Sequence, residues 1–293
     1  MNSLFTIKKP RTHGVKYPHY KQVLAQLTPE QVKIVKSKQI HGSKTSKEWL
    51  DLFQDILLYN QALSVKQGNF SFWATIVGIP LGLIIFFLPF LIFKNTLLIA
   101  VSSLLIMFTI FFLQAHITQL HSKLLADYFQ DIIVPLMIVL HEETAVDARI
   151  TLHVDLRHQK NEKHFASYIN RYECYHWQML HLSTQLYNNV NLDLKVNIRL
   201  YTKTNKPKAK RIILTKLNVQ YPKKHHNIID PTVIDQQAYK VKHREKPKKY
   251  VLSLSQKLKL KNNYFNEHDY SDLKLQALVQ MIRDSYRVTV LKP

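Results

Sequence analysis

Apolar residues follow three different patterns along the chain. In residues 46–67 they recur at helical spacing, with Trp49, Phe53 and Ile56 on one face. Residues 70–115 are almost continuously apolar, and the second half of the chain alternates apolar with polar positions. These patterns predict a helical N-terminal region, an apolar block and a β-rich C-terminal domain.

The apolar block contains two uncharged runs, residues 70–93 and 96–115, separated by Lys94 and Asn95. Each run is close to the ~20 residues that cross a hydrocarbon core as a helix. As one helix the two runs would be about 70 Å long, more than twice the ~30 Å thickness of that core. We therefore expect a two-helix transmembrane hairpin over residues 70–117, with Lys94 reaching the headgroups.

Charges on either side of the hairpin predict its orientation. Lys and Arg are abundant in both flanking segments, whereas the turn carries Lys94 alone, so the positive-inside rule places both termini in the cytoplasm. The prediction is a multi-pass membrane protein with the lipid bilayer as a partner. Its expected parts are a basic N-terminal cytoplasmic helical region (1–69), the hairpin (70–117), a juxtamembrane helix (118–145) and a cytoplasmic antiparallel β domain with a C-terminal helix (146–293).

A short helix is expected shortly before the longer one. Thr28, Pro29 and Gln31 have the spacing of a capping box with proline at the first helical position. The helix should therefore begin at Pro29.

The C-terminal domain is expected to be antiparallel β. Half-buried strands alternate apolar and polar side chains, and turn signals such as Asn188 and Asn189 separate the alternating segments. Their regular order predicts a small sandwich or barrel.

The expected fold class is thus an α+β membrane protein, a two-helix transmembrane hairpin plus a cytoplasmic antiparallel β-sandwich or barrel with flanking helices. The expected strands are residues 148–157, 177–186, 191–200, 213–221 and 250–260, followed by a helix over 271–283 and a last strand over 287–291.

The charge balance favours anionic partners. There are 41 Lys and Arg residues against 20 Asp and Glu, a formal net charge of +21. The partner could be phospholipid headgroups, nucleic acid or an acidic protein, all of which carry negative charge. Nucleic acid is not favoured, because the sequence has no aromatic platform for single strands and no groove-reading motif. The competing interpretation is a solvated surface on which lysines prevent the sheet edges from pairing with other chains. The candidate residues for binding an anionic partner are Arg149, Arg157, Lys195, Arg199, Lys210, Arg211 and Lys216.

Few residues suggest catalysis. Cys174 is the single cysteine, which excludes an intramolecular disulfide and favours a reducing compartment. No glycine follows Gly82, so the β domain has no glycine-rich phosphate loop, and no cofactor is expected. His153 and Asp155 share the outward face of one strand and are weak candidates for a metal site. A third ligand would have to come from His181 or from the pair His225 and His226, and the competing interpretation is a solvated polar strand face.

These observations favour a membrane-anchored cytoplasmic binding or scaffold module over an enzyme. The alternatives are a membrane-tethered metal-dependent hydrolase and a ligand-gated membrane-perturbing effector. A protein partner or a homo-oligomer fits the basic domain, as do anionic lipid headgroups. No family motif is present, although the expected architecture alone resembles that of membrane effectors in some bacterial anti-phage signalling systems.

Overall fold

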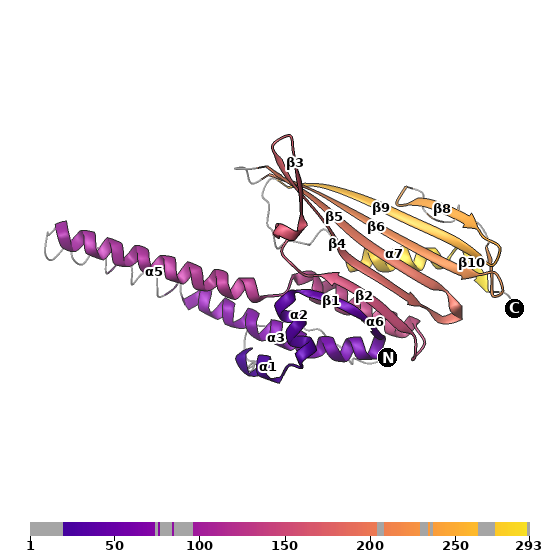
Figure 1. The fold of residues 1–293 in the computed structure, drawn as a ribbon, viewed down its shortest axis with the longest axis horizontal. Coiled ribbons are helices and arrows are strands. Elements are labelled where there is room, and N and C mark those ends of the chain that lie inside the picture. Colours follow the sequence, from indigo (N-terminus) through magenta and orange to yellow (C-terminus); the bar gives the residue numbers. More distant parts are fainter. Residues whose placement is uncertain are drawn as a thin grey trace. The chain divides into compact units, whose positions relative to one another are not determined.

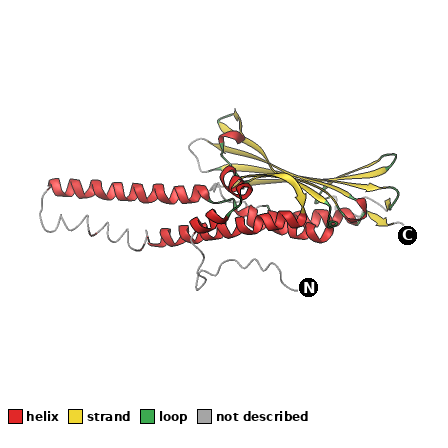
Figure 2. Ribbon diagram, turned by 60° about the horizontal axis from the view of Figure 1, so that its bottom comes forward, coloured by secondary structure: helices red, strands yellow, loops and turns green. Residues whose placement is uncertain are grey.

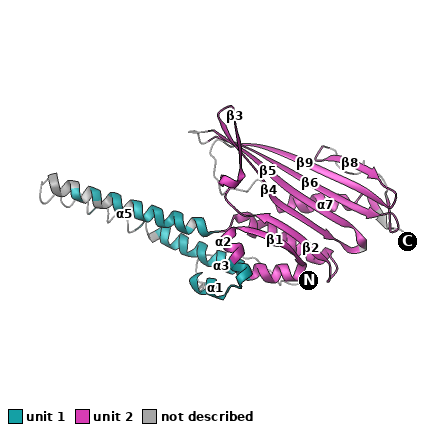
Figure 3. Ribbon diagram, in the orientation of Figure 1, with its two compact units in different colours: residues 1–32, 55–124 teal, residues 33–54, 125–293 magenta. Residues whose placement is uncertain are grey.

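Two compact units make up the protein (Figure 3). The computed structural model describes residues 20–73, 76, 84, 96–203, 208–228, 234, 237–262 and 273–291. Unit 1 takes the described parts of Met1–Val32 and Asp55–Leu124, and unit 2 those of Lys33–Gln54 and Leu125–Pro293.

Unit 1 is helical in its described residues. The capping box forms as predicted, because the Thr28 backbone N–H donates to Gln31 Oε1 at 2.8 Å and the Gln31 N–H donates to Thr28 Oγ1 at 3.3 Å. Gln31 Nε2 also donates to Asp55 Oδ2 at 3.0 Å, which fixes the start of α2 on α3. The helices are α1 (Tyr20–Gln26), the start of α2 (Pro29–Ser37), the later part of α3 (Ser46–Trp73) and most of α5 (Thr96–Lys123).

The predicted transmembrane hairpin is wrong. Most of its first span lies outside the described residues, and its second span belongs to α5. Across the part of the chain that the structure describes, no helix has both the length and the apolar character needed to cross a bilayer. The second apolar run is not a separate span but the first part of α5, which continues through the polar residues Gln114, His116, Gln119 and Lys123. The multi-pass membrane location and the cytoplasmic orientation derived from the hairpin are corrected with it.

Unit 2 is built on one large antiparallel sheet (Figure 1). Its strand order is β1-β2-β4-β5-β6-β9-β8, and β3 pairs with β4 beside this path. A separate pair joins β7 to β10. The strands are β1 (Gln39–Thr45), β2 (Arg149–Asp155), β3 (Phe165–Ile169), β4 (Tyr172–Gln185), β5 (Asn191–Lys203), β6 (Ala209–Pro222), β7 (His226–Ile228), β8 (Lys240–Glu245), β9 (Lys249–Asn262) and β10 (Thr289–Leu291).

Helices cover the apolar face of this sheet. Trp49, in the first part of α3, donates from Nε1 to the Ile150 carbonyl at 2.8 Å, and its ring packs so close to Gly42 that a Cβ there would lie 3.3 Å from it. Tyr221 of β6 donates its hydroxyl to the Ser285 carbonyl of α7 at 2.8 Å. The covering helices of unit 2, besides α3, are the π-helix η2 (Phe129–Ile133), α6 (Val134–Glu143) and α7 (Leu275–Tyr286); short 3₁₀ turns occupy η3 (Glu162–His164) and η4 (Tyr187–Asn189).

The sandwich-or-barrel prediction is corrected to one large open sheet with helices on one face, as the described residues show it (Figure 2). Alternation shows that each strand has one buried face, but it does not show whether a second sheet or a layer of helices buries that face. The predicted strands themselves are present as β2, β4, β5, β6 and β9, and the predicted C-terminal helix and last strand as α7 and β10.

Candidate anion-binding face

The uncovered side of the sheet carries a row of polar, mostly basic side chains that crosses seven strands. Cross-strand partners have side chains on the same face of a sheet. The register places His181 beside Lys195, Lys195 beside Lys216, Lys216 beside Ser255, and Ser255 beside Lys240. On the other side of His181 the same row continues through His153 of β2 and His41 of β1.

Neighbouring positions on the same face add further cations. Side chains two residues apart along a strand point the same way, so the row extends up and down each strand. We name the resulting set the basic face: Lys195 and Arg199 on β5, Lys210 and Lys216 on β6, Lys257, Lys259 and Lys261 on β9, and Lys240, Lys242 and Arg244 on β8.

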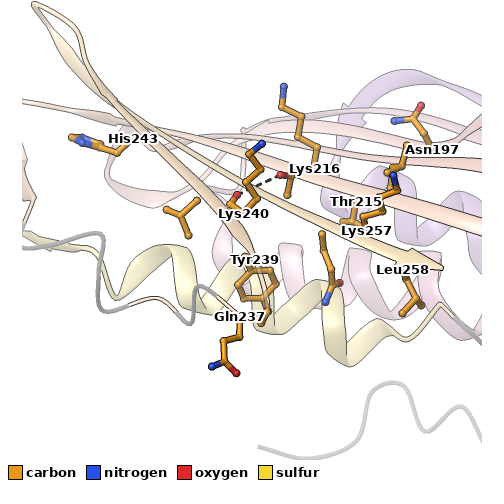
Figure 4. A pocket seen from close by; sticks show the side chains of 14 residues that line it. Asn197, Thr215, Lys216, Gln237, Tyr239, Lys240, His243, Lys257 and Leu258 are labelled. Atoms are coloured by element: carbon orange, nitrogen blue, oxygen red, sulfur yellow. Dashed lines mark hydrogen bonds between the residues drawn. The ribbon is translucent and has the colours of Figure 1, made fainter.

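Two hollows lie on this part of the sheet. The smaller, of about 460 Å³, has only Lys and Arg as charged lining residues, and the hydroxyls of Ser253 and Ser255 complete its polar wall. The larger, of about 1070 Å³, shares Lys216, Lys240 and Ser255 with it and also includes Lys257. Figure 4 shows Lys216 and Lys240 extending on one side of the strands. A ligand in either hollow would therefore meet converging ammonium groups.

Asp193, a carboxylate on this side of the sheet, already has cationic and polar partners. Asp193 Oδ1 accepts a hydrogen bond from His181 Nε2 at 2.8 Å, and Oδ2 accepts one from Asn218 Nδ2 at 3.1 Å and lies 3.5 Å from Lys195 Nζ. Burial alone would raise the pKa of Asp193, but these hydrogen bonds and the nearby Lys195 charge lower it below its usual value. Asp193 stays ionised and compensates only the edge of the basic face.

Like charges stand directly opposite one another at two places on this surface, where Lys195 lies beside Lys216 and Lys210 beside Lys261. Lys195 and Lys216 are direct cross-strand partners, an arrangement that destabilises a sheet unless an anion offsets it. Lys216, Lys240 and Lys242 are exposed, so their ammonium groups are available to such an anion.

The seven cations predicted from the sequence divide into three groups. Lys195, Arg199, Lys210 and Lys216 belong to the basic face, and Arg149 lies on the same side of the sheet but on β2. Arg157 is instead bound to Asp155, with Nη2 2.5 Å from Oδ2. Arg211 is 2% exposed and points to the covered side, because it neighbours Lys210 and Ile212 on an alternating strand. Arg211 therefore lies outside the basic face.

The metal candidates are held in different surroundings. Asp155 is buried, and its carboxylate accepts from Arg157 Nε at 2.9 Å and lies 3.0 Å from His164 Nε2. Burial opposes ionisation of Asp155, but these hydrogen bonds prevail and hold its pKa well below the usual range.

His153 lies in the cross-strand row, and its ring centroid is 5.6 Å from that of His41. Burial and the nearby His41 lower the pKa of His153, which favours its neutral form. His181 is its neighbour on β4, whereas His226 packs against Tyr221 at the β7 strand. Over the residues described, no three His, Cys, Asp or Glu side chains come together as a metal site would require. The metal hypothesis for His153 and Asp155 stays a prediction.

Cys174 offers little nucleophilic character. Its thiol is buried, and that burial raises its pKa, which keeps the sulfur protonated at neutral pH. A thiolate is the nucleophilic form of cysteine, so the surroundings of Cys174 favour a packing role.

The seven cations predicted from the sequence do not include those on β8 and at the end of β9. The signal was present, since "KVKHRE" and "QKLKLK" place basic residues at every second position. What the sequence did not show is that β8 and β9 are neighbours, which brings both series to one surface. Comparison with known protein families, curated proteins and solved structures finds no match for this chain.

Proposed function

We propose that this protein is a binding module whose basic face holds an acidic segment of a partner protein. The observation that carries the proposal is the smaller hollow, where Lys216, Lys240, Lys242 and Arg244 converge and every charged lining residue is a cation. A surface of this kind attracts carboxylates over a long range and orients the partner before contact.

Several features favour carboxylates over nucleic acid as the ligand. Lysine, a compact point charge, predominates over arginine on the basic face, and arginine is the residue suited to bidentate phosphate contacts. Single-stranded nucleic acid is usually held by aromatic side chains on which successive bases stack. Tyr201 is the aromatic residue beside Lys210 on this surface, and the Lys210 ammonium already lies 6.0 Å from the centre of its ring.

The proposal is tested by charge reversal on the full chain with a matched control. The double variant Lys216→Glu with Lys240→Glu removes two cations from both hollows. The control, Lys47→Glu with Lys163→Glu, changes the net charge equally at exposed positions of α3 and η3. The measurement is the affinity for fluorescein-labelled poly-L-glutamate, by anisotropy at two salt concentrations.

We expect the first double variant to lose about tenfold or more in affinity, and the control to lose less than about threefold. Equal losses in the two variants would show attraction by net charge alone and would overturn the proposal. A single-stranded poly(U) probe supplies the other decisive outcome. If poly(U) binding depends on Lys216 and Lys240 while poly-L-glutamate binding does not, the face serves nucleic acid.

A further inference from the structure

The strand β9 is longer than its neighbour β8, and among the strands that the structure describes this leaves part of one backbone edge unpaired. β9 pairs with β6 along its whole length, from Lys249 to Asn262. On the other side, β8 reaches only as far as Ser255. Among the described strands none pairs with residues 256–262 on that side, and Figure 1 shows β8 alongside only part of β9.

Exposure changes at the same point. In the part of β9 that β8 covers, side chains are buried or half-buried, whereas Lys257, Leu258, Lys259 and Lys261 are exposed. Leu258 is 39% exposed although it lies on the side of the sheet that is apolar elsewhere. A strand edge with this profile is a template for pairing with another chain.

The direction of the backbone groups follows from two hydrogen bonds at the start of β9. Lys246 N–H donates to the Lys249 carbonyl at 2.9 Å on the β8 side, and Lys223 N–H donates to the Lys248 carbonyl at 3.1 Å on the β6 side. In an antiparallel sheet successive residues bond to opposite neighbours. The backbone N–H and C=O groups of odd-numbered β9 residues therefore point toward β8. Beyond Ser255, the corresponding groups of Lys257, Lys259 and Lys261 point to the open edge.

The side chains of this segment specify what could pair there. Lys257, Lys259 and Lys261 belong to the basic face, whereas Leu258 and Leu260 point to the opposite face. Direct cross-strand partners share a face, so an added strand would need acidic residues opposite the lysines and apolar residues between them. The spacing of about 6.6 Å between alternate residues is common to both strands.

The larger hollow provides room at the start of the open edge. It is lined by Gln256, Lys257 and Leu258 of β9, by Lys240 at the beginning of β8, and by residues 237–239 just before that strand. Figure 4 shows Lys257 and Leu258 beside each other at this position. A strand entering here would continue the line of β8.

A second copy of this chain is the wrong occupant. Antiparallel pairing of two such edges would bring lysine opposite lysine, and repeated lysines are a means by which sheet edges avoid self-association. An acidic partner is subject to the opposite effect, since the same lysines attract it.

We infer that residues 256–262 of β9 accept an extended acidic segment by strand addition, with acidic and apolar residues alternating in the bound segment. The inference rests on the proposed function and specifies how the acidic partner is held. Main-chain hydrogen bonds would supply affinity, and the alternating lysines would supply selectivity.

The test separates backbone pairing from charge at one residue. Lys259→Gln removes the charge and keeps the outward N–H, whereas Lys259→Pro removes both. Proline is tolerated on an edge strand where the N–H does not bond within the sheet. The probe is a heptapeptide that alternates Glu and Val, and its affinity for the full chain is measured by calorimetry. Thermal melting of each variant confirms that it is folded.

We expect Lys259→Gln to weaken binding by about threefold and Lys259→Pro to weaken it by at least about fivefold more. Both should bind poly-L-glutamate almost alike at the Lys216 and Lys240 hollow, so failure here leaves the proposed function standing. Equal affinities of the two variants for the heptapeptide would overturn strand addition.

If the proline variant does not fold, the parent protein gives the same information with two modified probes. Methylation of the Glu backbone nitrogens blocks the groups that face β9, and methylation of the Val nitrogens blocks groups that face away. Only the first should abolish binding, and equal effects would overturn the inference.

Discussion

At the scale of single residues, the chemistry of Asp155 is dominated by its buried partners. Arg157 and His164 contact its carboxylate, and the Tyr128 hydroxyl donates to its backbone carbonyl. Trp177 stacks on His164 with ring centroids 4.9 Å apart, which holds the imidazole in place. Alternation predicted that His153 and Asp155 would both face outward. Instead, the Asp155 carboxylate is buried against Arg157 and His164, and a strand pattern does not reveal such hydrogen bonds.

Removal of the Asp155 charge is expected to destabilise the protein in a pH-dependent way. Asp155→Asn leaves Arg157 without its charged partner, so the free energy of unfolding at pH 7 should fall by about 3 kcal/mol. The folded pKa of Asp155 is lowered, so its contribution is complete above the unfolded value of about 4 and is lost as pH falls toward the folded value. Urea unfolding of parent and variant at pH 7 and pH 3 measures the difference.

Asp193→Asn is the matched control for that experiment. Asp193 also bonds to a histidine, but its side chain is 28% exposed and solvent screens its charge. Its loss should therefore lower the free energy of unfolding by less than about 1 kcal/mol. A difference between parent and Asp155→Asn that did not shrink at pH 3 would contradict the assigned role of the charge.

At the scale of elements, β5 is the central strand on which the alternation argument depends. Val196 is fully buried, and its neighbour Lys195 points to the basic face. Val196→Asp would place an unpaired charge in the apolar layer and should cost about 4 kcal/mol or more. Lys195→Glu changes an accessible charge and should alter stability by about 0.5 kcal/mol. Thermal melting distinguishes them, and similar melting of both variants would show that β5 is not half-buried.

The elements differ in how far sequence alone predicts them. Thr28, Gln31 and the alternation around Val196 act locally, so the capped helix and the central strands are predicted correctly. β1 was missed because "QIHGSKT" has little apolar content and contains Gly42. It becomes a strand through pairing with β2, and the glycine is suited to that place because Trp49 approaches it closely. Such tertiary causes leave no periodic signal.

The basic face, too, could be predicted only in part from the sequence. Lys195 and Lys216 were identified from their strands, but the register that makes them neighbours of Lys240 is a property of the assembled sheet. The sequence also suggested an anionic partner without indicating an open edge. That edge depends on the unequal lengths of β8 and β9, which pairing alone reveals.

At the scale of the whole molecule, unit 2 is assembled from two separate pieces of chain. Residues 33–54 contribute β1 and the beginning of α3, and residues 125–293 contribute the rest. The pieces are joined by the β1–β2 ladder and by the hydrogen bond from Trp49 to Ile150. The fold of the C-terminal part therefore depends on a segment that the chain places far upstream.

Side-chain packing strengthens this dependence. Phe53 and Phe129 are fully buried, with ring centroids 5.2 Å apart, and Ser46 Oγ lies 2.8 Å from His141 Nδ1. Loss of the upstream piece would expose the core face that these residues close and would leave β2 as an unpaired edge.

A fragment experiment follows from this arrangement. Residues 125–293 alone should aggregate or melt without cooperativity, because they lack β1 and the Trp49 and Phe53 side chains. Residues 33–54 joined by a flexible Gly/Ser linker to residues 125–293 should restore one cooperative transition. In this linked chain Trp49→Ala should lower the free energy of unfolding by about 3–5 kcal/mol, as expected for a buried tryptophan. Circular dichroism during heating measures all three. Cooperative melting of residues 125–293 alone, at the temperature of the linked chain, would show that the upstream piece is dispensable and that the strand pairing of β1 adds no stability.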